Sequence, residues 1–535
     1  MAHRTGTDRS QLLLIPTCLD DLIGEENPVR LVDVFVSALD LESHGFSHAR
    51  PKERGAPPYH PAPLLKLYLY GYLNRTRSSR QLEKACRANL EVRWLLQELA
   101  PSHATIADFR KTHPKPLREA FRTFNRFLRE EGLFGGETVA VDGSKFRAQN
   151  SKKNNHTADK IERHIEYIDN KLERYFEGMD TADAEEAQAL PAETEDKIAG
   201  AVKKLMERRF RYTDLQGQLE ESGATQISTT DPDARALPLH MGIVEVGYNV
   251  HTATDDKHSL VAHFEATNEN DTYALSPMAT AAKAELGLKE SDNLDVLADK
   301  GYCTASELKK CADAGTTTYV APKDNVNAQK DRDFQKDKFR YDKATDTYAC
   351  PQGETLATNG ELYEKQGRKK GHKPYRFRRY TLSYTVCSQC PFADRCLGRS
   401  KSKYRHGKHL ERSEFEGWAD ANRTRVEANR EKYRRRQAIA EHPFGTVKRQ
   451  WGYTYTLLKG MEKVAGGVAL VFTAYNLRRC MSILGVKTLV GKLEGLKNGL
   501  KSGFWAIFGR WRPVVRHSNV FSGTGYRFQA AAVAA

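Results

Sequence analysis

Three acidic residues, Asp142, Asp299 and Glu441, lie in sequence contexts where acids can do chemistry. Two of them close β-branched stretches typical of strands, and the third lies in a stretch typical of a helix. Carboxylates gathered in this way can hold two Mg²⁺ ions about 3.5–4 Å apart, one acting on the attacking oxygen and one on the leaving oxygen of a phosphodiester. The chain holds 69 acidic residues, so the surroundings of these three carry the interpretation.

The elements that must position these acids alternate between strands and helices. β-Branched and aromatic residues in period two predict strands, and apolar residues at spacing three and four predict helices. In chain order we expect a strand at Glu137–Gly143, a hairpin of Met241–Val250 and His258–Glu265, a helix at Tyr273–Leu286, a strand at Leu294–Asp299, a helix at Thr304–Ala314, a strand at Thr317–Ala321 and helix over 431–482. This order is typical of a mixed α/β sheet.

Other segments precede or interrupt this order. Residues 12–133 carry helical patterns, in which Leu82, Cys86, Leu90 and Trp94, for example, repeat along one helix face. Residues 151–230 indicate an inserted, antiparallel pair of charged helices. Residues 322–430 are expected to be irregular and basic, and the basic tail from 486 is expected to be partly disordered.

Charge and cysteine content exclude several classes of protein. Lys and Arg total 84 against 69 acids, a formal net charge of +15, which favours a polyanionic partner such as nucleic acid. No apolar run approaches the roughly 20 residues of a membrane span, and the apolar stretch near residue 12 is too short for a secretory signal. Nine cysteines make no disulfide scaffold, so we expect a cytoplasmic protein.

Four of the cysteines lie in the basic segment, at Cys350, Cys387, Cys390 and Cys396. A C-x₂-C pair can grip Zn²⁺, and four thiolates would close a tetrahedral structural site. The interval from Cys387 to Cys396 is looser than a second such pair, so free thiols are the alternative. A structural zinc ion is therefore one of two interpretations of this segment.

Basic residues are dense over 366–380, where Lys369 and Arg376 stand among Tyr375, Phe377 and Tyr380. Each phosphate neutralised by such residues adds a salt-dependent term to DNA affinity, and aromatic rings can stack on unpaired bases. A solubilising surface is the alternative. A phosphate-binding G-x₄-G-K-[ST] loop does not occur, so nucleotide hydrolysis is not indicated.

Several short motifs repeat the pattern of a known family. They are Pro58–Pro61, Ser78–Arg80, Thr105–Arg110, Val141–Lys145, Thr230–Arg235, Gly247–Val250, Ala298–Tyr302, Glu441–Lys448 and Ala474–Arg479. On these motifs the chain resembles the DDE transposases of bacterial insertion sequences. Within the IS-four-like and IS-five-like set it is most similar to the eleven-eighty-two group. The resemblance covers roughly residues 10–482.

The resemblance implies an RNase H-like core in which Asp142, Asp299 and Glu441 bind Mg²⁺ or Mn²⁺. It also implies that Lys448, seven residues after Glu441, contacts DNA phosphate. The family places an Arg four residues before the Glu, where this chain has Gln437, and Arg436 is the phosphate contact that we expect instead. Further DNA contacts are expected at three basic residues of the shared motifs, Lys300, Arg80 and Arg110.

The sequence thus predicts an α+β protein in three parts. Residues 1–133 form a helical DNA-binding domain, 134–482 an RNase H-like α/β catalytic domain with insertions at about 151–235 and 322–430, and 483–535 a basic tail. We expect a transposase that binds double-stranded DNA at terminal inverted repeats, cleaves it, and joins the 3′-hydroxyl ends to target DNA by two-metal phosphoryl transfer.

The expected enzyme acts as a homodimer on DNA, in the bacterial cytoplasm and associated with the nucleoid. A catalytically silent DNA-binding protein derived from such an enzyme, and a metal-dependent nuclease that does not join ends, are the alternatives. A serine or tyrosine recombinase is a third, but its covalent mechanism needs an activated nucleophile. Ser144, next to the first motif acid, has no base signature near it in the sequence.

Overall fold

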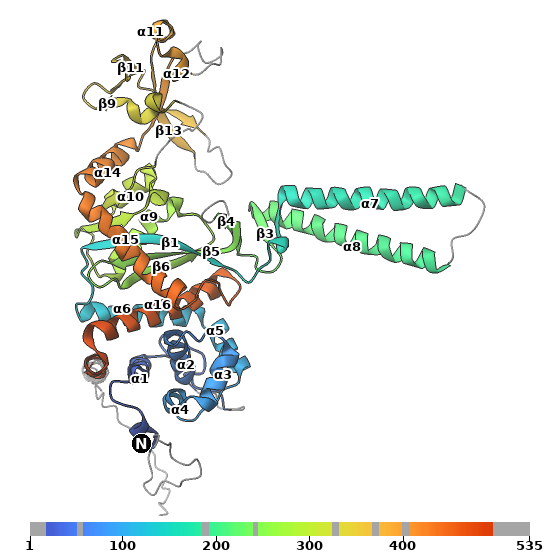
Figure 1. The fold of residues 1–535 in the computed structure, drawn as a ribbon, viewed down its shortest axis with the longest axis vertical. Helices are drawn as coiled ribbons and strands as arrows, with labels where there is room; N and C mark the ends of the chain where they lie inside the picture. Colours follow the sequence, from blue (N-terminus) through green and yellow to red (C-terminus); the bar gives the residue numbers. More distant parts are fainter. Residues whose placement is uncertain are drawn as a thin grey trace, which may run out of the picture.

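The computed structural model describes residues 18–50, 57–184, 192–238, 244–323, 331–365, 374–397 and 407–495. Helices form one end of the molecule, a mixed sheet lies in the middle and a smaller sheet forms the other end, while a pair of long helices projects sideways (Figure 1). The expected DNA contact Lys369 and the tail beyond residue 495 lie outside the described residues.

The N-terminal part is helical, as the sequence predicts. Its helices are α1 (Pro28–Ala38), α2 (Pro61–Leu73), α3 (Ser79–Ala88), α4 (Leu90–Leu96), α5 (His103–Thr112) and α6 (Pro114–Glu130). Proline at the first turn begins α1, α2 and α6, where its missing N–H costs no hydrogen bond. Helix α2 is buried almost all round, so the other helices pack about it.

The central sheet has six strands: β1 (Thr138–Arg147), β4 (Arg235–Pro238), β5 (Val244–Asp255), β6 (Val261–Thr267), β7 (Leu294–Ala298) and β8 (Thr316–Val320). Strands β4, β5, β1, β7 and β8 lie side by side in that order, and β6 also pairs with β5. Strands β1, β7 and β8 are parallel, whereas β1, β5 and β6 are antiparallel. The predicted strands and hairpin are confirmed, although β1 runs four residues beyond its expected end at Gly143.

Helices cover both faces of this sheet because its strands alternate buried side chains between two sides. On one face, α9 (Leu275–Glu285) and α10 (Ala305–Asp313) share the main core with Val139 and Val141. On the other face, Ala140 and Leu297 pack against Ile439 of α15 (Arg430–Phe444). Helix α15 therefore lies across β1 and β7 on the face toward which even-numbered residues of β1 point.

A long buried helix, α16 (Met461–Leu484), joins the N-terminal helices to the sheet. Asn476 accepts a hydrogen bond from the Val261 amide (2.9 Å) and donates to the Asn125 side chain (2.8 Å), so α16, β6 and α6 share one polar junction. The first turn of α16 is capped by Asp233, which accepts from the Met461 amide at 2.7 Å. The motif Thr230–Arg235 thus has a structural role.

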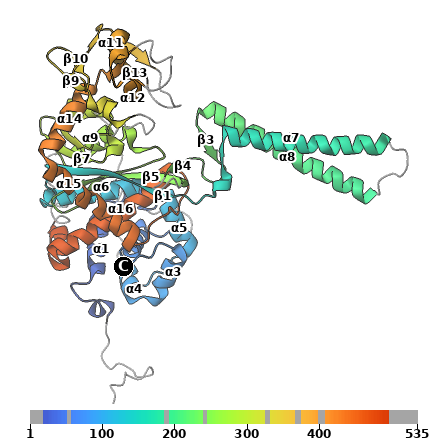
Figure 2. The ribbon, with the colours of Figure 1, turned by 45° about the horizontal axis from the view of Figure 1, so that its top comes forward.

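The projecting arm consists of α7 (Ala158–Ala184) and α8 (Ala192–Ser222), the pair of charged helices expected there. Both views show it extending away from the body (Figures 1 and 2). Short strands β2 (Asn155–Thr157) and β3 (Gln226–Ser228) pair at its base. A thin apolar seam that includes Ile168 and Leu205 joins the two helices.

The segment expected to be irregular is a second sheet, so that expectation is wrong for its described part. Its strands are β9 (Arg340–Asp342), β10 (Thr347–Ala349), β11 (Thr355–Thr358), β12 (Tyr363–Lys365), β13 (Tyr375–Thr381) and β14 (His409–Ser413). Short helices α11 (Tyr384–Gln389) and α12 (Ala393–Leu397) accompany it, and α14 (Glu416–Ala428) leads into α15. A small core that includes Tyr348, Leu356 and Leu410 supports it.

The start of the predicted basic tail is also ordered into helix. Residues 486–495 are helical, and Leu489 and Leu493 are buried in the main core. Within the described ranges, no helix combines the length and the apolar character that a membrane crossing requires.

The junction at Asn476 gives a test of how the helical part is held to the sheet. Replacing Asn476 by Leu leaves the Val261 amide and Asn125 Oδ1 without the partner that Asn476 provides, which costs about 1–3 kcal/mol of unfolding free energy. Urea denaturation measures the loss. The control Ser482→Ala, at an exposed position of the same helix, is expected to stay within about 0.5 kcal/mol. Equal losses in the two variants would contradict the role of the junction.

Candidate active site

Asp142 and Asp299 are brought side by side by the pairing of β1 with β7. The parallel register pairs Ala140 with Leu297 and Val141 with Ala298, so each acid is the first residue after the last pair. Neighbouring strands lie about 4.8 Å apart. Because the acids follow residues of the same register, they lie side by side at the point where β7 ends. Strand β1 continues past Asp142 to Arg147, paired with β5.

Two glycines make room for this arrangement. The Gly143 amide donates to Asp142 Oδ1 at 2.9 Å, and the Gly301 amide donates to Asp299 Oδ1 at 2.8 Å. A Cβ at Gly143 would stand 2.8 Å from the Tyr302 hydroxyl, and one at Gly301 would stand 2.9 Å from Asp299 Oδ1. Any side chain at either position would displace atoms of the site.

The carboxyl group of Asp142 is hard to ionise where it lies. Burial is the main cause that raises its pKa to about 6, and the nearby charge of Asp299 acts in the same direction, whereas the Gly143 amide and Arg436 lower the pKa. Arg436 of helix α15 therefore acts on Asp142 as a positive charge.

Glu441 lies on the same helix but is exposed. The side chain of Gln437 donates to Glu441 Oε1 at 3.0 Å, one helical turn away. Its neighbours Ile439 and Ala440 are buried against the sheet, so α15 holds Glu441 at the edge of this contact. Gln437, which stands where the family has Arg, therefore contacts the third acid, while the Arg436 guanidinium lies 5.8 Å from the centroid of the Tyr433 ring.

Lys448 lies beside the same strand, although not on the regular helix that its spacing suggested. Residues Gly445–Gln450 form a π-helix, so the α-helical phase between Glu441 and Lys448 is lost. The Lys448 ammonium group donates to Ser144 Oγ at 2.7 Å and to the Lys145 carbonyl at 2.6 Å, and burial lowers its pKa to about 8. No sequence motif indicates this Ser–Lys contact.

Four residues of this site have no predicted role: Asp271, Asn249, His251 and Tyr302. His251 Nδ1 lies 2.7 Å from the Tyr302 hydroxyl, and burial lowers the pKa of His251 to about 4. Asn249 donates to Asp271 Oδ1 at 2.8 Å. Asn249 and Tyr302 stand in motifs that the sequence singles out, whereas for Asp271 the only signal is that it follows a strand.

The other residues that were expected to contact DNA differ in their exposure. Lys300 and Arg80 are exposed. Arg110 is only 6% exposed, with its guanidinium over the Tyr68 ring and donating to the Tyr72 hydroxyl, so this placement does not support contact with DNA. Arg376 is exposed and forms a bidentate pair with Glu414. Of the aromatic residues of that strand, Phe377 and Tyr380 are buried and offer no face to a base.

The four cysteines of the second sheet line one cavity of about 350 Å³. Cys350 Sγ accepts from the Gln352 amide at 3.3 Å, and Cys387 Sγ accepts from the Lys408 amide at 3.4 Å. The four residues are thus neighbours in space, as a shared role would need.

No group of three or more His, Cys, Asp or Glu side chains in the described ranges is gathered tightly enough to hold a metal ion. The donor chemistry of the acidic centre nonetheless suits Mg²⁺, which prefers carboxylate oxygens. Among the described residues, Asp142 Oδ1 accepts a hydrogen bond from the Gly143 amide, and Asp299 Oδ1 accepts one from the Gly301 amide. Neither oxygen is paired with a cationic side chain of these residues.

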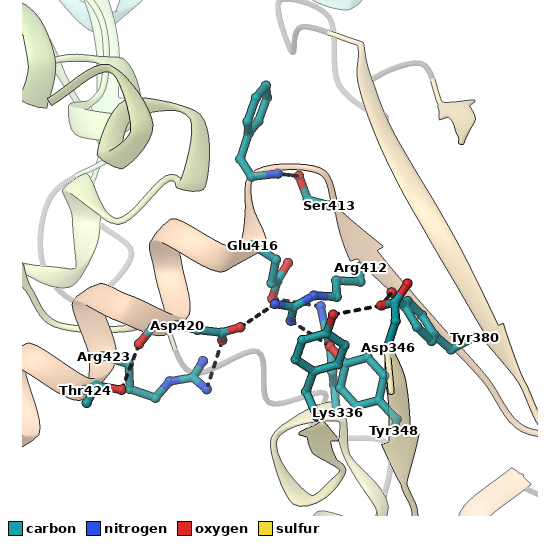
Figure 3. Close-up of polar contacts among 12 residues, drawn as sticks. Lys336, Asp346, Tyr348, Tyr380, Arg412, Ser413, Glu416, Asp420, Arg423 and Thr424 are labelled. Atoms are coloured by element: carbon teal, nitrogen blue, oxygen red, sulfur yellow. Dashed lines mark hydrogen bonds and ion pairs between the residues drawn. The ribbon is translucent and has the colours of Figure 1, made fainter. Parts of the chain in front are cut away.

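A larger cavity, of about 1080 Å³, lies between the second sheet and α14. Figure 3 shows its wall, where Arg412 lies between Tyr348 and Asp420. Arg412 donates to the Tyr348 hydroxyl at 3.0 Å and to Asp420 at 2.6 Å, and Lys336 pairs with Glu416 at 2.9 Å. The wall charges are therefore largely neutralised within the protein.

The rim of this cavity is different, because several of its cations are unpaired. Lys338, Arg340 and Lys343 line the cavity and are exposed. Within the part of the chain that the structure describes, none of the three forms an ion pair. An excess of positive charge at an open cavity is suited to a polyanion.

The raised pKa of Asp142 predicts a pH dependence of stability for the metal-free protein. The folded state holds this proton more tightly than the unfolded chain, so its stabilising effect is full below pH 3.8 and is lost as pH rises through about 6. Asp142→Asn removes this loss. As pH rises from 4 to 7, the unfolding free energy of the variant should increase relative to that of wild type by on the order of 2–3 kcal/mol. Urea denaturation at each pH measures this difference. A difference that does not change with pH would contradict the burial of this carboxyl group.

No curated protein matches. Among solved structures, the synaptic complex of piggyBac transposase with hairpin DNA matches at 8% identity over 92% of this chain and 83% of that chain, with a TM-score of 0.28, too low to support any argument.

Two family models match separate parts of the chain. "Transposase domain (DUF772)" matches residues 17–112, and "Transposase DDE domain" matches residues 349–481. The second match includes Glu441 but neither Asp142 nor Asp299. Together, the two matches support a DDE transposase.

Proposed function

We propose that this protein is a DNA transposase of the insertion-sequence eleven-eighty-two group. It would cleave DNA at terminal inverted repeats and join the freed 3′-hydroxyls to target DNA, with Asp142, Asp299 and Glu441 as its catalytic acids. The observation that carries the proposal is the β1–β7 register, which makes the two strand-end aspartates neighbours. The family matches at 17–112 and 349–481 support the same function.

The strand order supports an RNase H-like catalytic core. Strands β6, β5, β1, β7 and β8 have the order expected of that fold, with the first three antiparallel and the last three parallel. We propose residues 134–482 as this domain, with insertions at about 151–235 and 322–430. Residues 1–133 would then bind the terminal repeats, and 483–535 would be the tail.

Mg²⁺ or Mn²⁺, when bound by the three acids, would activate the attacking oxygen and stabilise the leaving oxygen. The chain's own residues supply position and charge. The positive charge of Arg436 acts on Asp142, and we propose that it contacts a DNA phosphate there. Lys448 donates hydrogen bonds to Ser144 and to the Lys145 carbonyl. These contacts favour a role for Lys448 in holding β1 in place beside Asp142.

The remaining features of the proposal concern partners and surroundings. Two transposon ends must be handled together, so we propose a homodimer on double-stranded DNA, in the bacterial cytoplasm with the nucleoid. Zinc on Cys350, Cys387, Cys390 and Cys396 stays a prediction, with free thiols as its alternative. Lys300 and Arg80, both exposed, stay predicted DNA contacts.

The Ser144–Lys448 contact favours one alternative mechanism. A lysine with a lowered pKa can act as the base that activates a serine, as covalent catalysis requires. A covalent mechanism would leave DNA attached to the protein, whereas hydrolysis through the acidic centre would not. Labelled DNA that stays with the protein in detergent gels would therefore favour the serine mechanism.

Cleavage of labelled duplex DNA that carries the element's own terminal repeat tests the proposal. With Mg²⁺ or Mn²⁺, wild type should cut at the repeat end, and Asp299→Ala should lose cleavage while it keeps DNA binding. The control Asp292→Asn removes an acid from the loop before β7, outside the site, and should cut like wild type.

Three outcomes of this assay carry different meanings. Strand-transfer products from wild type support a transposase, and cleavage without them supports the nuclease alternative. Equal cleavage by wild type and Asp299→Ala contradicts the assignment of this acid. Binding without cleavage by either protein favours the silent DNA-binding alternative.

The rim cations of the large cavity test whether DNA passes along the second sheet. The triple variant Lys338→Gln, Arg340→Gln, Lys343→Gln should bind duplex DNA more weakly. The slope of log affinity against log salt should fall by about 2 to 3, because each lost phosphate contact removes about 0.9. Binding titrations from 50 to 200 mM salt measure both quantities.

A matched control also removes three cations, the exposed Arg50 and Lys487 and the partly exposed Lys309, each of which is paired with a carboxylate away from the cavity. Its slope should change little, because these cations are already neutralised. Equal changes in the two triple variants would mean that total charge, and not the cavity rim, determines DNA affinity.

A further inference from the structure

Asp271 lies against the acidic centre, although no sequence motif marks it. It begins the 3₁₀ turn η4 (Asp271–Tyr273), between β6 and α9. A Cβ built at Gly301 would lie 2.9 Å from Asp299 Oδ1 and 3.3 Å from Asp271 Oδ2. The two carboxylates therefore face the same small space beside Gly301.

The second glycine of the centre leaves room for the other oxygen of this carboxylate. A Cβ built at Gly143 would lie 2.9 Å from Asp271 Oδ1, next to the Tyr302 hydroxyl. Asp271 thus reaches between the residue that follows Asp142 and the turn that follows Asp299. The backbone on both sides is free of side chains where this carboxylate enters.

The orientation of Asp271 is fixed by a buried partner. Asn249, which is 0% exposed, donates to Asp271 Oδ1 at 2.8 Å and also to the Glu269 carbonyl at 3.1 Å. Oδ1 is therefore held, whereas Oδ2 has no hydrogen-bond or ion-pair partner among the described residues. The unpartnered oxygen is the one that faces Asp299.

The charge of this pair of carboxylates is uncompensated by the protein. Two other acids near the sheet do have a basic partner: Asp295 pairs with Lys432, and Asp256 pairs with Arg435. In the described part of the chain, neither Asp271 nor Asp299 forms an ion pair with Lys or Arg. Two facing carboxylates without a cation repel each other, and a divalent cation shared between them would remove that cost.

We propose that Asp271 is a further metal-binding carboxylate of the acidic centre, with Oδ1 oriented by Asn249 and Oδ2 directed at the cation beside Asp299. The proposal rests on the proposed metal-dependent function. It adds to the three acids of the family motif a fourth that comes from the turn between β6 and α9.

Mn²⁺ binding to the metal-free full-length protein tests this directly, by isothermal titration and without DNA or catalysis. Asp271→Asn keeps an oxygen that can accept from Asn249 but removes the charge. Its Mn²⁺ dissociation constant should rise at least about tenfold, as is typical when a partner in a metal site is lost. The control Glu269→Gln removes an exposed charge two residues earlier and should leave the constant unchanged.

Asp299→Asn serves as the reference that separates the two proposals. If Asp299→Asn weakens Mn²⁺ binding and Asp271→Asn does not, Asp271 is not a ligand and the proposed function stands. If wild type binds no Mn²⁺, both proposals are overturned. Should Asp271→Asn fail to fold, Asp271→Glu replaces it; its carboxylate is displaced by one methylene, so weaker binding is expected and unchanged affinity would overturn the proposal.

Discussion

Repulsion between two carboxylates at adjacent strand ends is the constraint on which the rest of the site depends. At about 5 Å and an effective dielectric constant of about 20, two such charges repel by about 3 kcal/mol. The parallel register of β1 and β7 fixes their backbones, so the charges cannot separate without breaking the sheet. The raised pKa of Asp142 records part of this cost, and Arg436 offsets part of it. A cation-binding centre needs such an arrangement, because a site already neutralised by the protein would have little affinity for a metal.

The helices around the sheet keep the two strands from relaxing. Helix α15 packs on one face through Ile439 and Ala440, while the main core, with α9, fills the other. Helix α16 adds the polar junction at Asn476, where a single side chain satisfies the backbone of β6 and contacts α6. His442 of α15 contacts the Tyr475 hydroxyl of α16 at 2.7 Å, so the helix that carries Glu441 is tied to the same support.

The parts of this site that the sequence predicts are those set by local pattern. Asp142 and Asp299 follow buried, β-branched stretches, and the pairing of β1 with β7 ends at the residues just before them. Asp271 has no such signal, because its place depends on how the turn after β6 folds back toward Gly301. Arg110 was expected to contact DNA, yet it is buried against Tyr68 and Tyr72, which lie about forty residues earlier in the chain. Contacts at that separation leave no local pattern.

The second sheet was missed for a related reason, since strands as short as β9 and β10 cannot display a period. Helix α14, which follows this sheet, is joined to the central sheet by specific hydrogen bonds. Asn422 of α14 is fully buried, accepts from the Val320 amide at 3.0 Å and donates to the Val320 carbonyl at 2.7 Å. A side-chain amide thus takes the hydrogen bonds that a neighbouring strand would give to β8, and it caps the open edge of the sheet. Helix α14 lines the large cavity and leads into α15. The Asn422 contact therefore connects this cavity to the central sheet, in which the two aspartates lie.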